Sequence, residues 1–253
     1  MRITRTRFIA GLALLAGLAA CRADEMAHGP QWMFPTQVRG SGVTTSLEHV
    51  LGAPFTRLEV DGSLDVSVKP AAAGAPARVL VEGDDNLVGK VLVEVRGSTL
   101  WLRPEDGNLR PLAGLRATVE APSYDTLVLR GSGEVTFEGF AAGALSVEVF
   151  GTGSVKGSGE VNSLRVRVHG SGDADLIAMK SGQTSVEIQG SGDARVTARA
   201  QARVDIHGSG DVHLYGEPTD WTWTIRGSGQ VFFVDPRGNE RLAPTGRPVS
   251  APK

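Results

Sequence analysis

The chain has 253 residues, with 26 basic and 28 acidic side chains and a single cysteine. One cysteine excludes an intramolecular disulfide and a cysteine-based zinc site. The near balance of charge lacks the basic excess that nucleic-acid binding requires, so we expect no nucleic-acid partner.

Residues 1–20 are predicted to be a lipoprotein signal peptide. Arginines precede an apolar stretch, Phe8 to Ala20, that is too short to cross a bilayer, which needs about 20 apolar residues. The segment ends in Leu-Ala-Ala-Cys, similar to a bacterial lipobox, and this predicts acylation (palmitate) of Cys21 and a membrane anchor. Arg22 follows in place of Asp, which favours the outer membrane. An ordinary signal peptide followed by a buried cysteine is the alternative.

Composition divides the rest of the chain into three segments. Residues 21–52 contain Gly and Pro without sustained periodicity, and we expect a lipidated tether and linker there. Residues 53–236 form one domain in which helix signals are nearly absent and apolar residues alternate with polar ones, as in Leu64-Asp65-Val66-Ser67-Val68. Residues 237–253 are rich in Pro and Gly and are expected to be a disordered tail.

A Gly-Ser/Thr-Gly turn recurs along the second half of the domain. Its six copies begin at Gly131, Gly151, Gly170, Gly190, Gly208 and Gly227, at intervals of 20, 19, 20, 18 and 19 residues. A fixed period of this size indicates one supersecondary unit stacked on itself. The structural turn residues are Gly131, Gly133, Gly151, Gly153, Gly170, Gly172, Gly190, Gly192, Gly208, Gly210, Gly227 and Gly229.

Aligned positions of the repeat keep their residue type. Two residues before the first glycine, the copies have Leu129, Val149, Val168, Ile188, Ile206 and Ile225, so this column is expected to face a core. Stacked coils explain such uniformity, and the predicted fold is all-β: a single-stranded right-handed parallel β-helix with a less regular N-terminal half. Gly62 to Asp65 would be a worn first copy of the turn. An antiparallel β-meander or barrel is the alternative.

Three turns continue as Gly-Ser-Gly-Asp, at Gly170–Asp173, Gly190–Asp193 and Gly208–Asp211. With the lipobox and the opening Pro54-Phe-Thr-Arg-Leu-Glu-Val60, they resemble the auto-transporter adhesin, head GIN domain family over about residues 50–236. The resemblance implies a β-helix-like, envelope-associated domain without established catalytic residues.

The aspartates that follow three of the turns, here called the acidic column, are the strongest candidates for a functional site. Asp173, Asp193 and Asp211 would lie on successive coils, where like charges repel. Each carboxylate could accept N–H groups of its own turn, which we favour, or the column could bind Ca²⁺ through its oxygens. His169 and His207 would be two coils apart, about 9–10 Å, which is too far to share a metal. We therefore expect no cofactor, with Ca²⁺ as the alternative.

Aromatic residues gather at the last copy of the repeat, and they include Trp221, Trp223 and Phe233. They are expected to close the open end of the helix, and an aromatic platform for a sugar is the alternative.

The turn serines lie in no Gly-x-Ser-x-Gly elbow, which a serine nucleophile would favour. No pair of carboxylates of the kind that glycoside hydrolysis uses stands out from the column of aspartates. We therefore expect a non-catalytic envelope lipoprotein that presents a repeated β surface for adhesion or for binding an envelope protein or glycan. A β-helical polysaccharide-active enzyme and an envelope-stress sensor that binds a membrane protein are the alternatives.

Overall fold

A computed structural model of the protein describes residues 37–72, 74–105 and 109–243. The predicted signal peptide, residues 1–20, and the predicted lipidation site Cys21 lie outside these residues, as do residues 244–253 of the predicted tail. Among the described residues, no helix is long and apolar enough to cross a membrane.

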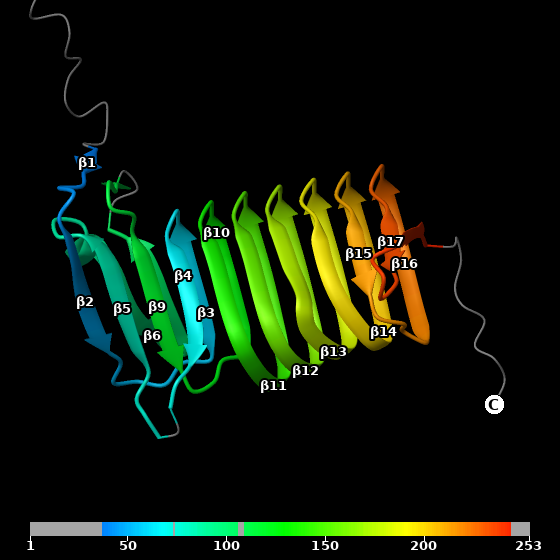
Figure 1. The fold of residues 1–253 in the computed structure, drawn as a ribbon, viewed down its shortest axis with the longest axis horizontal. Coiled ribbons are helices and arrows are strands. Elements are labelled where there is room, and N and C mark those ends of the chain that lie inside the picture. The colour runs from blue at the N-terminus through cyan, green and yellow to red at the C-terminus, as the bar shows by residue number, and fades with distance from the viewer. Residues whose placement is uncertain (1–36, 73, 106–108, 244–253) are drawn as a thin grey trace, which may run out of the picture. The chain divides into compact units, whose positions relative to one another are not determined.

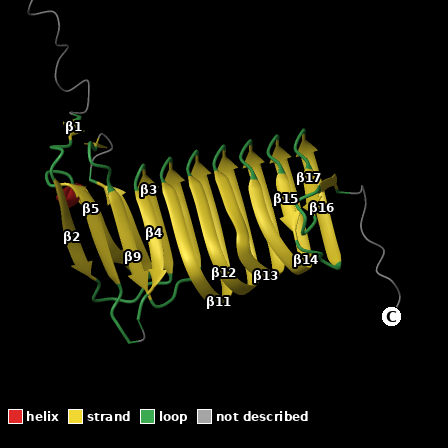
Figure 2. Ribbon diagram, in the orientation of Figure 1, coloured by secondary structure: helices red, strands yellow, loops and turns green. Residues whose placement is uncertain are grey.

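The described part of the chain is almost entirely β-structure, with one short 3-10 helix, η1 (Val88–Lys90) (Figure 2). The strands are β1 (Val38–Arg39), β2 (Thr44–Val50), β3 (Arg57–Gly62), β4 (Asp65–Pro70), β5 (Arg78–Asp84), β6 (Val91–Arg96), β7 (Thr99–Pro104), β8 (Leu109–Arg110), β9 (Arg116–Ala121), β10 (Thr126–Gly131), β11 (Glu134–Gly151), β12 (Ser154–Gly170), β13 (Asp173–Gly190), β14 (Ala194–Gly208), β15 (Val212–Tyr215), β16 (Asp220–Gly227), β17 (Val231–Val234) and β18 (Glu240–Leu242).

The repeats form a parallel β-solenoid (Figure 1). β3, β10, β11, β12, β13, β14 and β16 pair in this order, always in parallel. The first glycines of all copies are in register, from Gly62 through Gly131 to Gly227. The predicted β-helix and its worn first copy are therefore confirmed, and the antiparallel meander is excluded for this region.

Each coil contributes to two faces. Face 1 contains β3, β7, β10, β16 and the C-terminal parts of β11–β14. Face 2 contains β4, β9, β15, β17 and the N-terminal parts of β11–β14. The Gly-Ser-Gly turns join the faces along one edge, and the long strands bend from face 2 into face 1 along the other (Figure 1).

Unequal repeat lengths are accommodated along the bent edge. The register shifts lie between Phe137 and Phe140, between Lys156 and Gly159, and between Leu176 and Gln183. Gly157 leaves room there for the buried ring of Phe137, since a Cβ at Gly157 would lie 2.0 Å from the ring. Repeats of 18 to 20 residues thus keep both faces in register.

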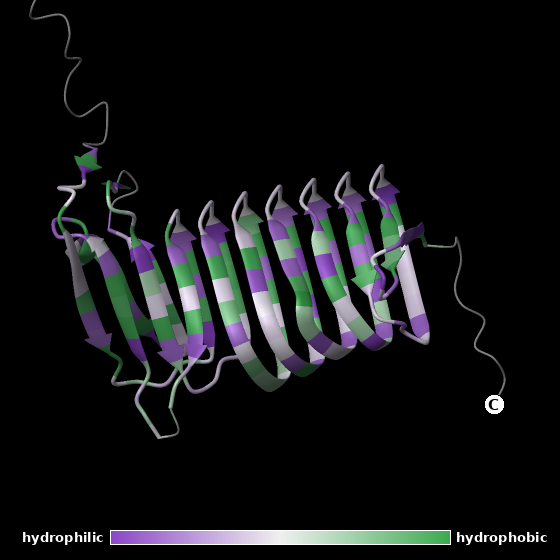
Figure 3. Ribbon diagram, in the orientation of Figure 1, coloured by the Kyte–Doolittle hydropathy of each residue, from purple (hydrophilic) through white to green (hydrophobic). Residues whose placement is uncertain are grey.

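The core fills the space between the faces. In the column two residues before the first glycine, the side chains from Leu129 to Ile206 are 0 % exposed. Hydropathy alternates along the straight parts of the central strands, as Figure 3 shows. Two residues depart from the sequence reasoning. Val128 is buried although it alternates with the core residues Leu127 and Leu129, and Ile225, in the same column as Leu129, is 38 % exposed because no coil follows it on face 1.

The N-terminal end is less regular, as predicted. β2 pairs antiparallel with β5, β5 with β9, and β6 with β7. β1 and β2 fall within residues 21–52, and β18 falls within residues 237–253, so folded chain extends into both segments that were expected to be linker or tail.

A buried aspartate holds this N-terminal end together. The carboxylate of Asp84 accepts backbone N–H groups of Gly42 at 2.6 Å, Leu112 at 2.9 Å and Ala113 at 3.2 Å. Burial by itself would raise the pKa of Asp84, but the hydrogen bonds from these backbone groups outweigh it and hold the pKa below its usual range. The charged form of Asp84 therefore ties two loops to the end of β5.

Candidate functional site

The Gly-Ser-Gly turns stack directly on one another. Gly190 has a φ of 137°, and a Cβ there would lie 2.1 Å from the carbonyl oxygen of Gly170 in the preceding coil. The N–H of Ser191 donates to that same carbonyl oxygen at 2.8 Å. Only glycine permits this backbone conformation and this close approach. The turns are therefore structural and leave no room for a ligand between coils.

The acidic column forms a hydrogen-bonded ladder between coils. Asp173 Oδ1 accepts the N–H of Asp193 at 2.9 Å, and Asp193 Oδ1 accepts the N–H of Asp211 at 2.8 Å. Asp211 Oδ1 in turn accepts the N–H of Gln230 at 2.8 Å. The sequence reasoning placed the donors in the aspartate's own turn, and this is corrected: they belong to the following coil. Each carboxylate thus joins two coils.

The histidines of face 1 lie against other side chains. His169 stacks on Phe150 with ring centroids 4.7 Å apart, and His207 Nε2 is 3.4 Å from Arg226 Nη1. Within the described ranges, no group of three or more His, Cys, Asp or Glu residues is arranged to hold a metal ion. Calcium binding by the acidic column stays a prediction.

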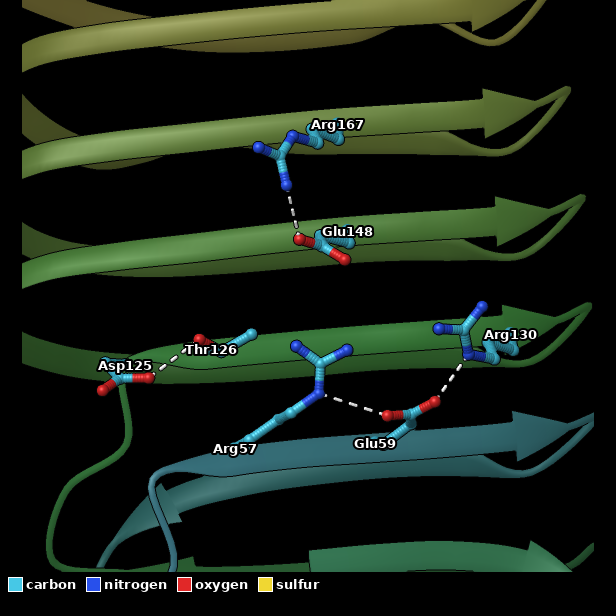
Figure 4. A network of polar contacts seen from close by, with 7 residues as sticks. All are labelled: Arg57, Glu59, Asp125, Thr126, Arg130, Glu148 and Arg167. Carbon is cyan, nitrogen blue, oxygen red and sulfur yellow. Dashed lines mark hydrogen bonds and ion pairs between the residues drawn. The ribbon is translucent and has the colours of Figure 1, made fainter. Parts of the chain in front are cut away.

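Charged side chains form ladders across face 1 (Figure 4). Arg167 pairs with Glu148 at 2.8 Å and with Glu187 at 3.6 Å, which are its neighbours in the register on either side. Ion pairs at a protein surface contribute about 0.2–1 kcal/mol each. They support the register of neighbouring coils.

Glu59 is more deeply buried than these carboxylates, because its side chain is only 4 % exposed. Its carboxylate accepts from Arg57 Nε at 3.2 Å and from Arg130 Nε at 2.5 Å (Figure 4). The guanidinium of Arg130 also lies 4.3 Å from the ring centroid of Phe150. Burial, followed by repulsion from Glu59, raises the pKa of nearby Asp61. This end of face 1 is therefore occupied by its own ion pairs.

A groove of about 350 Å³ opens on face 1 nearer the C-terminal end. Two columns of polar side chains cross it, and each takes one residue from each of four neighbouring strands, β12, β13, β14 and β16. One column is Ser163, Gln183, Gln201 and Asp220, and the other is Arg165, Ser185, Arg203 and Thr222.

The groove presents hydrogen-bonding groups at the spacing of the coils, about 4.8 Å. Arg165 and Arg203 lie on either side of Ser185 in the register, which puts their Cα atoms about 10 Å apart. Arg165 has no ion-pair partner among the described residues, whereas Arg203 Nε lies 3.1 Å from Asp205. Two guanidinium groups around a hydroxyl can bind an anionic group and its polar neighbours.

Sequence reasoning did not single out these groove residues. They occupy outward-facing columns of the same repeat alignment whose inward-facing columns predicted the core, so the alignment places them on one face. The alignment does not show where this face is hollowed into a groove, because that depends on the sizes of neighbouring side chains.

The aromatic residues of the last coil lie at the C-terminal end. Trp221 stacks on Trp223 with centroids 4.3 Å apart, and each lies edge-on to Phe233, at 5.7 Å and 6.2 Å. Phe233 is buried, whereas both tryptophans are half-buried. Phe232 faces outward and stacks on His213. The cluster covers the core at this end only in part.

Comparison with known proteins identifies the family. The model of the family described as "Putative auto-transporter adhesin, head GIN domain" matches residues 54–218. The chain belongs to the head GIN domain family. No curated protein matches it.

Solved structures share the head GIN fold. A putative adhesin from Bacteroides fragilis is 18 % identical, with a TM-score of 0.66 over 78 % of this chain and 100 % of that one. A putative lipid binding protein from Parabacteroides distasonis is 20 % identical, with a TM-score of 0.54 over 79 % of this chain and 100 % of that one. At these identities the likeness concerns the fold. Membership of the head GIN family points to a non-enzymatic adhesion or binding role at a bacterial cell surface or envelope.

Proposed function

We propose that this head GIN domain is the binding part of a lipid-anchored adhesion protein of the bacterial outer membrane. In this proposal the groove on face 1 binds an extended acidic glycan. The observation that carries the proposal is the pair of polar columns that crosses four neighbouring strands.

The chemistry of the groove favours a glycan over a compact ligand. Its lining consists of amide, hydroxyl, guanidinium and carboxylate groups, with the buried Thr184 and Ala202 between the columns. A polymer lying along the solenoid axis would meet similar groups on every coil, because the columns repeat at the coil spacing. Arg165 and Arg203 supply the positive charge that favours a carboxylate or sulfate on that polymer.

A lipid is the second ligand class to weigh, because one similar structure is named a lipid binding protein. An acyl chain needs an apolar cavity, and the solenoid interior is filled by its own side chains, of which Leu129, Val149 and Ile188 are 0 % exposed. The polar lining of the groove supports the glycan.

The enzyme alternative needs two carboxylates that face each other across a bound sugar. Of the residues that line the groove, Asp220 alone carries a carboxylate. This supports a binding role. An envelope-stress sensor would bind a membrane protein, and cell fractionation followed by cross-linking distinguishes it from an adhesion protein.

A glycan array with the full chain in detergent tests the proposal. We expect binding to acidic glycans that falls at least about tenfold in an Arg165→Ala/Arg203→Ala variant, because two charge-assisted contacts are lost. Arg195→Ala is the matched control, since Arg195 is on β14 but belongs to face 2. Binding to phospholipid vesicles, measured in parallel, tests the lipid alternative. Binding that is unchanged by the double substitution would contradict the proposal.

Membrane anchoring has a separate test. Wild-type chain should incorporate labelled palmitate and fractionate with the outer membrane, and Cys21→Ser should abolish both, since Cys21 is the single cysteine of the chain. Inner-membrane residence would favour the sensor.

A further inference from the structure

The charge along the groove of face 1 changes from coil to coil. The groove crosses β12, β13, β14 and β16, which are neighbours in this order. β12 contributes Arg165 and β14 contributes Arg203, so the two positive charges are two coils apart. Between them, β13 contributes the neutral Gln183 and Ser185, and after them β16 contributes the negative Asp220. An extended ligand therefore meets a cation, a neutral position, a second cation and an anion in turn.

Carboxylates make the positions between and after the two arginines unfavourable for an anion. Glu187 is two residues beyond Ser185 in β13, on the same side of the strand, and its side chain is 39 % exposed. It shares Arg167 with Glu148, so these three side chains keep a net negative charge. Asp220 is exposed and lines the groove directly. An anionic group beside β13 or β16 would thus be repelled, whereas one beside β12 or β14 would be attracted.

Both arginines keep hydrogen-bond donors for a ligand. Arg165 is exposed, and none of the ion pairs between described residues involves it. The side chain of Arg203 is 70 % exposed and meets Asp205 through Nε at 3.1 Å, whereas a guanidinium carries five N–H donors. Each guanidinium can therefore hold a carboxylate or sulfate through two parallel hydrogen bonds. Two anionic groups held in this way would lie about 10 Å apart, the length of two coil spacings.

This spacing corresponds to every second sugar of an extended polymer. Neighbouring coils are about 4.8 Å apart, and one β-linked pyranose unit lengthens its chain by nearly the same distance. Successive sugars that lie along the solenoid axis would therefore face successive coils. The four strands of the groove span about 14 Å, which is enough for three or four sugars.

We infer that the groove selects a polysaccharide with a disaccharide repeat, in which an acidic sugar alternates with a neutral or amino sugar. This inference rests on the proposed glycan-binding function and adds to it the spacing of the acidic groups. Acidic groups two sugars apart bind Arg165 and Arg203. The sugar between them places hydroxyl or amide groups at Gln183 and Ser185, and Asp220 accepts hydrogen bonds from the sugar that follows.

Binding of three β-linked hexasaccharides to the full chain in mild detergent tests the inference at one fixed salt concentration. The probes are a hyaluronan hexasaccharide, with a carboxylate on every second sugar, a mannuronate hexasaccharide, with a carboxylate on every sugar, and the neutral cellohexaose. Fluorescence polarisation of end-labelled probes measures each affinity. We expect the hyaluronan probe to bind at least about tenfold more tightly than the mannuronate probe, because extra carboxylates would face Glu187 and Asp220. The neutral probe should bind more weakly than the hyaluronan probe.

A substitution that changes the charge pattern tests the same point within the protein. Ser185→Arg puts a cation on the coil between the two arginines, so the mannuronate probe should then bind within about threefold of the hyaluronan probe. Ser154→Arg is the matched control, because it adds the same charge on face 2 and should leave the preference unchanged. Circular dichroism checks that both variants keep their fold.

The outcomes separate this inference from the proposed function. Mannuronate binding as tight as hyaluronan binding in the wild-type chain, or a preference that Ser185→Arg does not change, would overturn the alternating pattern and leave a groove for acidic glycans. Failure of the wild-type chain to bind either acidic probe would overturn the proposed function and this inference together.

Discussion

Replacing Gly190 by alanine should destabilise the solenoid strongly. The φ of 137° disfavours an L side chain by about 1–2 kcal/mol. The new Cβ would also lie 2.1 Å from the Gly170 carbonyl oxygen, where ordinary contact begins at 3.4 Å. The two coils would have to separate by about 1 Å, which weakens two hydrogen bonds, Ser191 N–H to Gly170 O and Asp193 N–H to Asp173 Oδ1, each worth about 1 kcal/mol.

The expected loss in the free energy of unfolding is therefore about 3–4 kcal/mol. For a domain of this size it corresponds to a melting temperature lower by about 10 °C. Urea and thermal unfolding followed by circular dichroism would measure both quantities. Gly143→Ala is the matched control, because no atom lies within 4 Å of a Cβ at Gly143 and its φ is not positive.

The control variant should unfold within about 1 kcal/mol of wild type. Equal stabilities of Gly190→Ala and Gly143→Ala would refute the reasoning, because they would mean that the turns do not stack as closely as described.

Three further predictions concern the carboxylates. Asp193→Ala should cost about 1–2 kcal/mol by urea unfolding, because the N–H of Asp211 loses its acceptor, whereas Asp193→Asn keeps an acceptor oxygen and should cost less; tight Ca²⁺ binding by calorimetry that is lost in Asp193→Ala would reverse the structural interpretation. Asp84 has a lowered pKa when folded, so its stabilisation is present above about pH 4 and is lost as the pH falls through the folded pKa. The stability difference between wild type and Asp84→Asn should therefore shrink from pH 6 to pH 3, and a constant difference would contradict this. Glu59→Gln should destabilise the domain by about 1–2 kcal/mol in the same unfolding assay, and the exposed Glu187→Gln by less than about 0.5 kcal/mol.

Much of the repeat region was predictable because each coil repeats the environment of the last. The period and the uniform column from Leu129 to Ile206 predicted parallel stacking, and the register confirms it residue by residue. The worn turn at Gly62 was also placed correctly. These are local properties, since a residue's column depends only on its distance from the turn.

The ends of the solenoid were less predictable. The antiparallel pairing of β2 with β5 and the network around Asp84 join segments 28 to 42 residues apart that carry no repeat. Ile225 is exposed because no described strand follows β16 in face 1, and the residue type alone does not indicate where the stack of coils ends.

The sequence by itself determined which residues of the two faces lie above one another, because the distance from a glycine turn sets the column of the residues on either side of it. Only the tertiary structure decided that each aspartate bonds to the following coil, that Arg165 and Arg203 border a hollow, and that β16 ends face 1 with an open edge. These features depend on distances between coils and on the sizes of neighbouring side chains, which a one-dimensional pattern does not contain.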